Sequence, residues 1–349
     1  MRPARWFGIL LIALLSTPFT AGAEQVKLRI TLQVSATNPL LGVALVHFKE
    51  EVEKRTEKET SVEIFDKGKL YIDDQVVDAV SSGAIEMGVA GFNQLVKRVP
   101  AVDIMQQPFL FNFEALVRAA ASRDSELRKV IGKAVLDAVG VRVLWWESFG
   151  STVFFSKGRD VREPDQIKNQ KVRVFSETMA QLTRLCGGTP VVLSSSKMHD
   201  ALKSGAADMA MTGIGTVETR ELWKVTDTVT RTEHGALEFF VIMNGKTWQS
   251  LSQSHETIIE EAARKAERRV RDKVSEVESK AYAFAREKGM KILDLTPDQV
   301  AEWRACSSGV LEAYMGSTSD LVRQLTAAYG KLRTDPCCSS GPTGSFNRR

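Results

Sequence analysis

Apolar and polar residues alternate from Leu28 to Val34, which is the period of a half-buried β-strand. An apolar stripe at helical spacing follows over Leu41 to Lys54, and Ser61 to Phe65 has the composition of another strand. The succession recurs, with strands expected at Val141 to Trp146, Val172 to Phe175 and Val191 to Leu193 and a helix at Thr178 to Cys186. Such alternation predicts an α/β fold with helices packed on mainly parallel sheets.

Two segments repeat each other. DAVSSGAIEM at residues 78–87 matches DALKSGAADM at 200–209, and both lead into stretches of small residues. A helix that ends at a glycine and continues into a short apolar strand explains the pattern, because glycine adopts the left-handed conformation without Cβ strain. The repeat therefore predicts two similarly built lobes. Ligands of open α/β sheets bind at the carboxyl ends of the strands, so the two lobes are expected to form a cleft.

A long amphipathic helix is expected from about His255 to Lys288, ending before Gly289. A coiled coil is the alternative, but the small residues of the apolar stripe favour packing across a globular body. Another helix should begin at Thr296, where Pro297 occupies the first turn and Gln299 completes a capping box.

The first residues have the features of an export signal. Arg2 and Arg5 precede an apolar run, and Ala21-Gly22-Ala23 supplies the small residues of a cleavage site. We expect cleavage after Ala23, a periplasmic mature chain and a disordered tail over 336–349; an N-terminal membrane helix is the alternative reading of the apolar run.

Charge and cysteine content narrow the function classes. The formal net charge is +4, with acidic and basic residues interspersed, so nothing predicts a nucleic-acid surface. The four cysteines, Cys186, Cys306, Cys337 and Cys338, allow three disulfide connectivities in an exported protein, and their spacing is not that of a zinc site. No cofactor is expected.

Several motifs resemble one known family in their order and spacing. The clearest are KVRV at 171–174, GGTPV at 187–191 and ALKSGAAD at 201–208, with weaker matches at 48–53, 108–111 and 234–248. Over about residues 27 to 330 the chain resembles the periplasmic substrate-binding proteins of tripartite ATP-independent periplasmic (TRAP) transporters, the DctP family.

The resemblance implies a two-lobed periplasmic binding protein fold, with a mainly parallel sheet in each lobe and a long helix that spans both. We expect lobe I over 24–147 plus about 236–275, and lobe II over 148–235 plus about 276–335, after a signal peptide over 1–23. The implied ligand is a small organic acid, and the implied partners are the small and large integral subunits of a TRAP permease. A monomer is expected more than a dimer.

Arg173 is the principal candidate for ligand binding. It lies in the expected strand Val172 to Phe175, and a guanidinium binds a carboxylate through two parallel hydrogen bonds. In the family that this chain resembles, the arginine of this motif binds the substrate carboxylate, and Arg173 occupies that position. A surface arginine on a solvated strand is the alternative.

Six further residues are candidate ligand contacts. Thr212 stands where many relatives have a ligand-binding Asn, and Thr152 stands near the place of a second Arg. A single cation suits a monocarboxylate, or an acid whose remainder is apolar or aromatic. The other candidates are Glu147, Phe175, Asn38 and Asn93. Core packing for Phe175, a structural ion pair for Glu147 and turn roles for the two asparagines are the alternatives.

Three other function classes compete with this interpretation. An enzyme is disfavoured because the four histidines show no zinc-ligand spacing and no G-x-S-x-G nucleophile elbow is present. A sensory protein that presents its acid to a receptor would have the same fold and pocket. The binding protein of an ATP-driven importer is disfavoured by the order of the motifs.

Overall fold

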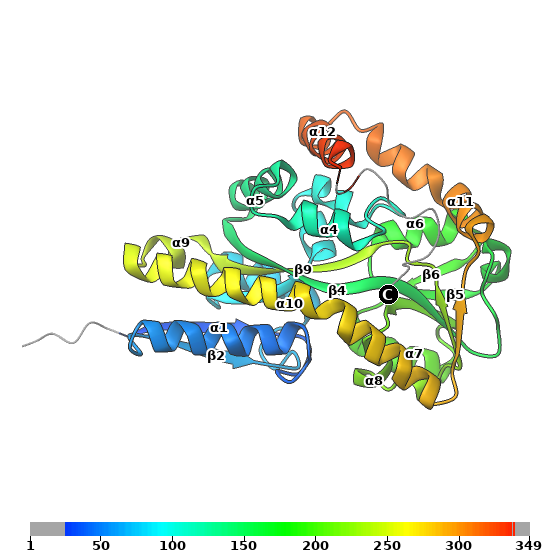
Figure 1. Ribbon diagram of the computed structural model, residues 1–349, viewed down its shortest axis with the longest axis horizontal. Coiled ribbons are helices and arrows are strands. Elements are labelled where there is room, and N and C mark those ends of the chain that lie inside the picture. Colours follow the sequence, from blue (N-terminus) through cyan, green and yellow to red (C-terminus); the bar gives the residue numbers. More distant parts are fainter. Residues whose placement is uncertain (1–24, 337, 339–349) are drawn as a thin grey trace, which may run out of the picture.

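The computed structural model describes residues 25–336 and residue 338, within which ten strands form a sheet system flanked by helices (Figure 1). The strands are β1 (Val26–Thr31), β2 (Thr60–Phe65), β3 (Met87–Gly91), β4 (Val141–Ser156), β5 (Lys171–Val174), β6 (Thr189–Val192), β7 (Met209–Gly213), β8 (Thr228–Arg231), β9 (Ala236–Asn244) and β10 (Lys291–Asp294). The helices are α1 (Leu41–Arg55), α2 (Val76–Ser82), α3 (Phe92–Val96), α4 (Glu114–Ala121), α5 (Glu126–Val139), α6 (Glu177–Leu185), α7 (Met198–Ser204), α8 (Thr216–Thr219), α9 (Gly245–Gln249), α10 (Gln253–Glu287), α11 (Pro297–Met315) and α12 (Asp320–Thr334).

Two lobes are joined through two crossing strands. The first lobe is built on β1, β2 and β3, and the second on β5, β6, β7, β8 and β10. Within each lobe the neighbouring strands pair in parallel, as the alternation of strands and helices predicts. The crossing strands β4 and β9 run antiparallel to each other and to their neighbours β3 and β7. The long β4 runs ten residues beyond the strand expected to end at Trp146, because it passes from one lobe into the other.

Strand β4 is irregular at the point where the lobes meet. Its register against β9 shifts between Ser148 and Gly150, and Gly150 has a φ of +93°, which a residue with a side chain rarely adopts. A Cβ at Gly150 would also lie 2.3 Å from a carboxylate oxygen of Glu278 on α10. The same oxygen accepts a hydrogen bond from the backbone N–H of Ser151 at 3.0 Å. Helix α10 therefore holds the bulge from outside the sheet.

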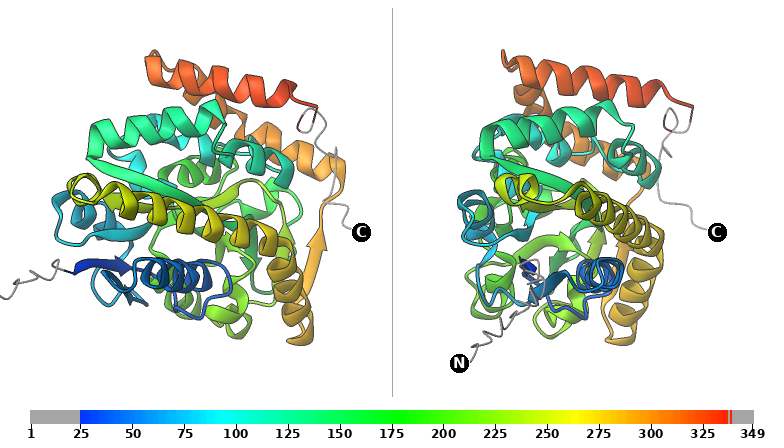
Figure 2. Two further views of the ribbon diagram at one scale, coloured as in Figure 1. Left: turned by 60° about the vertical axis from the view of Figure 1, so that its left-hand side comes forward. Right: turned by 90° about the vertical axis from the view of Figure 1, so that its left-hand side faces the viewer.

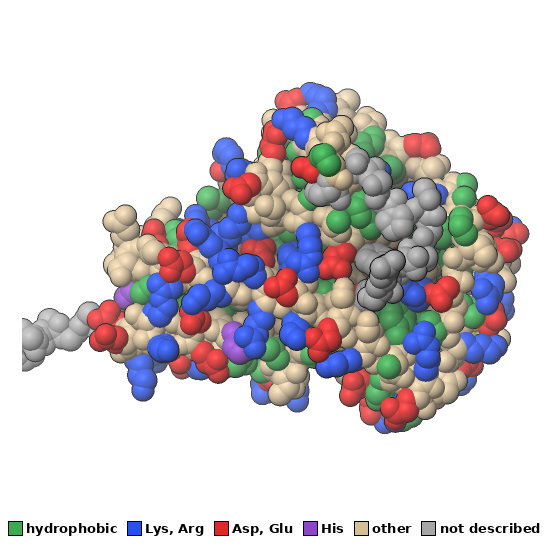
Figure 3. All heavy atoms as spheres, viewed as in Figure 1, with side chains coloured by type: hydrophobic (Ala, Val, Ile, Leu, Met, Phe, Trp, Pro, Cys, Tyr) green, Lys and Arg blue, Asp and Glu red, His purple; other side chains and the backbone are tan. Residues whose placement is uncertain are grey.

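Helix α10 spans both lobes, as the amphipathic pattern predicts (Figure 1). Its buried apolar residues from Ile259 to Val274 belong to a hydrophobic core of the first lobe. Ala281, Tyr282 and Ala285 belong to a core of the second lobe. The face of the molecule that carries α10 shows Lys and Arg side chains intermixed with Asp and Glu (Figure 3). The exposed side of the helix therefore pairs its charges locally, for example Lys280 with Glu276 at 2.8 Å.

The two matching sequence segments adopt the same local structure. Helix α2 ends at Gly83 with a φ of +79° and is followed by β3, while α7 ends at Gly205 with a φ of +75° and is followed by β7. Strand β3 pairs with β9, and β7 pairs with β4. Each repeat thus places its strand beside a crossing strand, in equivalent positions of the two lobes.

The last two helices pack one on each lobe. Helix α11 begins with the expected capping box, in which Thr296 and Gln299 exchange hydrogen bonds of 3.0 and 3.3 Å. Its Trp303 and Val310 lie in a core of the second lobe. Helix α12 buries Val322, Leu325 and Ala328 in a core of the first lobe and lies over α5 (Figure 2). The division into lobes expected from the sequence remains a prediction, and it assigns α12 to lobe II although the core contacts of this helix are with the first lobe.

A disulfide joins Cys186, at the end of α6, to Cys306 on α11. This bond selects one pairing among those that the sequence left open. The expected signal peptide over 1–23 and most of the tail over 336–349 lie outside the described residues. Along the described part of the chain, no helix combines the length and apolar character needed to cross a bilayer.

Charged side chains are buried between the crossing strands and α10. Glu238 pairs with Arg271 at 2.7 Å, and Glu267 pairs with Arg128 at 2.6 Å. Glu147 is fully buried beside them and accepts a 2.9 Å hydrogen bond from the Trp145 indole, while its other carboxylate oxygen has no partner among the described residues. Burial, with the neighbouring Glu267 and Glu238 charges, raises the pKa of Glu147 to about 8.

Removing the disulfide with Cys186→Ser and Cys306→Ser should lower the free energy of unfolding by about 2 to 5 kcal/mol, because the bond closes a long loop in the unfolded chain. Urea unfolding of the oxidised wild type and the double variant measures the difference. Equal midpoints with equal slopes would contradict it.

Glu147→Gln should remove a pH-dependent loss of stability. The folded-state pKa of Glu147 is about 8 and the ordinary value is 4.5, so the folded protein binds an extra proton between these values. Stability is therefore complete below about pH 4.5 and falls as the pH rises through about pH 8. Relative to Glu147→Gln, the wild type should lose on the order of 5 kcal/mol over this window. Parallel stability curves of the two proteins against pH would contradict the assignment.

Candidate functional site

A cavity of about 530 Å³ lies between the lobes. Residues at or just after the carboxyl ends of β1, β3, β5, β6 and β7 line it, so strand ends of both lobes meet there. This is where ligands of open α/β sheets bind, and the volume is within the usual range for small-molecule sites. The cleft predicted from the two matching segments is therefore present as a cavity between two sets of strand ends.

Arg173 lies on β5 and is 2% exposed at the wall of this cavity. Its Nε and Nη2 donate to the Leu193 carbonyl at 3.0 and 2.7 Å, and its Nη1 donates to the Met211 carbonyl at 3.0 Å. These carbonyls belong to the end of β6 and to β7, the two strands that flank β5. Backbone groups of both neighbouring strands therefore fix the guanidinium, which pre-organises it for an anion.

Burial lowers the pKa of Arg173 to about 10, and the Asp73 carboxylate opposes that shift. The guanidinium therefore remains charged at neutral pH. A second guanidinium, Arg220, lies just after α8 and lines the same cavity. Burial lowers the pKa of Arg220 as well, again against the effect of Asp73. The cavity is thus lined by two cations from the second lobe, the buried Arg173 and the half-buried Arg220.

Asp73 provides the opposing charge from the first lobe. It begins a short 3₁₀ turn, η1 (Asp73–Gln75), and lines the cavity. Burial raises the pKa of its carboxyl group, while Arg220, Arg173 and the backbone N–H of Ser195 favour the charged form. All three of these stabilising groups belong to the second lobe, so this carboxylate acts across the cleft.

Two further contacts cross the cleft at the cavity. The Asn93 amide of α3 donates a 2.9 Å hydrogen bond to the Phe175 carbonyl, which follows β5. The Thr178 hydroxyl of α6 lies 2.6 and 2.7 Å from the two carboxylate oxygens of Asp103, a residue of the 3₁₀ helix η2 (Pro100–Gln106). Burial raises the pKa of Asp103, and its bonds to Thr178 and Gln107 oppose the shift. The lobes are therefore in direct contact beside the cavity.

The structure brings four of the seven candidate residues together in the cavity: Arg173, Thr212, Asn93 and Phe175. The other three are not among the residues that line it. Asn38 accepts hydrogen bonds from the backbone N–H groups of Leu40 and Leu41, which is a turn role at the start of α1. Thr152 is buried in β4 opposite Gly213, and Glu147 is buried among the charges beneath α10.

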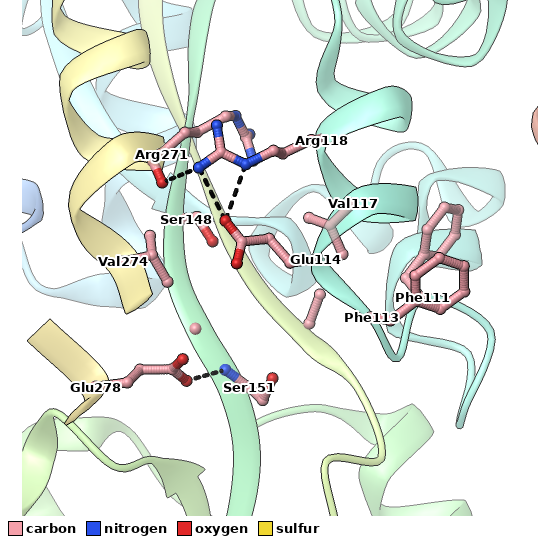
Figure 4. A pocket seen from close by; sticks show the side chains of 12 residues that line it. Phe111, Phe113, Glu114, Val117, Arg118, Ser148, Ser151, Arg271, Val274 and Glu278 are labelled. Atoms are coloured by element: carbon pink, nitrogen blue, oxygen red, sulfur yellow. Dashed lines mark hydrogen bonds and ion pairs between the residues drawn. The ribbon is translucent and has the colours of Figure 1, made fainter. Parts of the chain in front are cut away.

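A second, smaller hollow lies between α4, α10 and β4 (Figure 4). Arg118 spans it, with hydrogen bonds to Glu114 and to the Arg271 carbonyl, and Glu278 bonds the Ser151 amide. These polar groups satisfy one another's hydrogen-bonding capacity around the bulge in β4. The hollow is accordingly part of the joint between the lobes, and the larger cavity is the candidate ligand site.

Asp73, Arg220 and Asp103 were missed in the sequence analysis. Asp73 stands three residues before the first helix of the repeat, at the equivalent of Ser195, which also lines the cavity. That internal correspondence could have directed attention to it. Arg220 lies in a polar stretch between two short helical turns and has no periodic pattern that distinguishes it from a surface residue. Among the described residues, no group of three or more His, Cys, Asp or Glu is arranged to hold a metal ion.

Known proteins resemble this chain along most of its length. A solute-binding protein of Verminephrobacter eiseniae is 28% identical over 276 residues, which cover 78% of this chain and 80% of that protein. The C4-dicarboxylate-binding periplasmic protein DctP of Rhodobacter capsulatus is 26% identical over 296 residues, or 83% and 86% of the two chains.

The fold also matches solved structures. A TRAP periplasmic solute-binding protein from Desulfovibrio salexigens with bound orotic acid superposes with a TM-score of 0.81 at 23% identity, covering 88% of this chain and 98% of that one. One from Sulfitobacter sp. NAS-14.1 with bound β-D-galacturonate also has a TM-score of 0.81, at 19% identity, with coverage of 87% and 99%. Residues 31–317 match the profile of bacterial extracellular solute-binding protein family 7 (DctP), and the chain belongs to that family.

Proposed function

We propose that this protein captures a small organic acid in the cavity between its lobes and delivers it to a TRAP-type membrane permease. The observation that carries the proposal is the buried, charged Arg173 at the wall of an interlobe cavity. A buried cation requires compensation, and a ligand carboxylate is a suitable partner for a guanidinium.

The hydrogen bonding of Arg173 leaves capacity for a ligand. A guanidinium has five N–H donors, and the Leu193 and Met211 carbonyls accept one from each of its three nitrogens. Donors remain on Nη1 and Nη2, although Nη1 also lies 3.5 Å from the weakly accepting sulfur of Met198. A carboxylate can accept two N–H groups at once, with charge-assisted bonds worth about 1.5 to 3 kcal/mol each.

The remaining wall suits the organic part of such a ligand. Phe149, Phe175 and Phe239 line the cavity together with polar Thr212 and Asn93. The similar proteins bind organic acids, which are C4-dicarboxylates by the name of one relative and orotic acid and β-D-galacturonate in two solved structures. They support an organic acid as the ligand of this chain. Which acid binds depends on the residues that line this particular cavity.

Proteins of this family are periplasmic. In our proposal the signal peptide is removed after Ala23, and the mature protein acts as a monomer that passes its ligand to the small and large integral subunits of the permease. Binding and release without chemical conversion complete this cycle, so the protein acts without a cofactor.

Arg173→Ala and Arg173→Lys should both lose most of the stabilisation by the ligand. In the wild type, an acid at about 100 times its dissociation constant should stabilise the folded state by about 2.7 kcal/mol. Alanine removes the charge, and lysine cannot reproduce the planar fork. Thermal shifts with a panel of organic acids measure the effect. Each variant is compared with its own ligand-free melting temperature, because losing the bonds to Leu193 and Met211 also lowers stability.

Arg184→Ala is the matched control. This arginine lies on α6, where it is exposed and pairs with Glu177 at 2.6 Å, and it is not among the residues that line the cavity. It should keep the full ligand-induced shift. An undiminished shift in Arg173→Ala would place the ligand elsewhere.

A further inference from the structure

The cavity holds more charge than one arginine, and these charges are distributed unevenly between the lobes. Arg173 and Arg220 contribute two cations from the second lobe, and Asp73 contributes a carboxylate from the first. Asp73 interacts electrostatically with both arginines, and the Ser195 amide of the second lobe also favours its charge. One intramolecular carboxylate thus already neutralises part of the anion-binding end of the cavity.

The other charged residues that line the cavity either pair with residues outside it or are exposed, with the exception of Asp103. Glu238 pairs with Arg271 at 2.7 Å, and the exposed Glu177 pairs with Arg184 at 2.6 Å. Asp74 and Lys97 are exposed. Asp103 remains as a second carboxylate in the cavity, with its bonds donated by the uncharged Thr178 and Gln107.

These positions restrict the charge of the ligand. Around the two arginines, Asp73 is the acidic group that acts on both, so these three residues leave one net positive charge, which matches one ligand carboxylate. A second ligand carboxylate would meet the remaining acidic groups, Asp73 at the arginines and Asp103 elsewhere in the wall. Like charges in a partly desolvated cavity repel strongly, whereas a hydroxyl can donate a hydrogen bond to the same carboxylates.

We propose that Asp73 is a specificity-determining residue that makes this cavity selective for monocarboxylates over dicarboxylates of the same carbon skeleton, by acting as a built-in counter-ion of Arg173 and Arg220. This inference rests on the proposed function and adds the charge class of the ligand. In this proposal Arg220 is the second cation of the site. Residues from both lobes then set the net charge that selects the ligand.

Paired probes test the inference. Affinities are measured by calorimetry for aliphatic, sugar-derived and aromatic acids supplied as mono- and dicarboxylate pairs, such as butanoate with succinate, D-gluconate with D-glucarate, and 2-methylbenzoate with phthalate. The wild type should prefer the monocarboxylate of each pair that binds. Asp73→Asn should shift the affinity ratio toward the dicarboxylate by about tenfold or more, since it removes one charge beside the ligand.

Asp78→Asn is the matched control, because it removes the same charge from an exposed position of the same lobe that does not line the cavity. Its affinity ratio should stay within about twofold of the wild type, given the weakness of screened surface charges. The double variant Asp73→Asn with Arg220→Gln restores one net positive charge and should restore the preference for monocarboxylates. A residue that merely helped the lobes to close would change both members of a pair equally.

The outcomes separate this inference from the proposed function. A wild type that binds the dicarboxylates more tightly, or equal shifts in Asp73→Asn and Asp78→Asn, would overturn the role of Asp73 while carboxylate binding stands. A double variant that keeps the ratio of Asp73→Asn would also overturn it. Binding of no acid by any of these proteins would overturn the proposed function, and the role of Asp73 with it.

Discussion

The site depends on one constraint, which is that a guanidinium withdrawn from water must have its charge and its N–H groups compensated from several directions. Arg173 meets this constraint through backbone carbonyls at the end of β6 and on β7, so its orientation is determined by the sheet. The remaining compensation comes from the opposite lobe, through Asp73, and in the proposed function from the ligand. Arg173 therefore interacts both with the sheet of its own lobe and with a carboxylate of the other lobe.

The residues that position Arg173 also explain why it could be identified from the sequence as a candidate ligand-binding residue. Arg173 stands in a short apolar strand. This strand, the helix after it and Gly205, which ends the helix of the repeat, all lie where the sequence pattern predicts them. Thr212, Asn93 and Phe175 follow predicted strand ends, so the rule that ligands bind at these ends places them in the cavity. The family resemblance singled out Arg173 and Thr212 as candidates, and local periodicity with one topological rule accounts for their place at the cavity.

The other residues depend on tertiary packing that no local pattern encodes. Asn38 and Thr152 lie near expected strand ends or motif positions, but a turn and the register of β4 direct them away from the cavity. Glu147 enters the interior because β4 continues past the expected strand end and α10 covers it. Arg220 and Asp73 come together only when the lobes face each other, and they are separated by more than a hundred residues of chain.

The position of α12 has a consequence for how the chain acquires its structure. Val322, Leu325 and Ala328 complete a core whose other buried members come mainly from residues 76–146, together with Phe240, Ile242 and Cys338. The second lobe is therefore, in topological terms, an insertion within the first. A growing or translocating chain can assemble the second lobe from nearly contiguous segments, whereas the first must wait for residues close to the carboxyl terminus. The late arrival of that helix leaves the core of the first lobe incomplete until the end of synthesis, so its apolar surface stays exposed during that time.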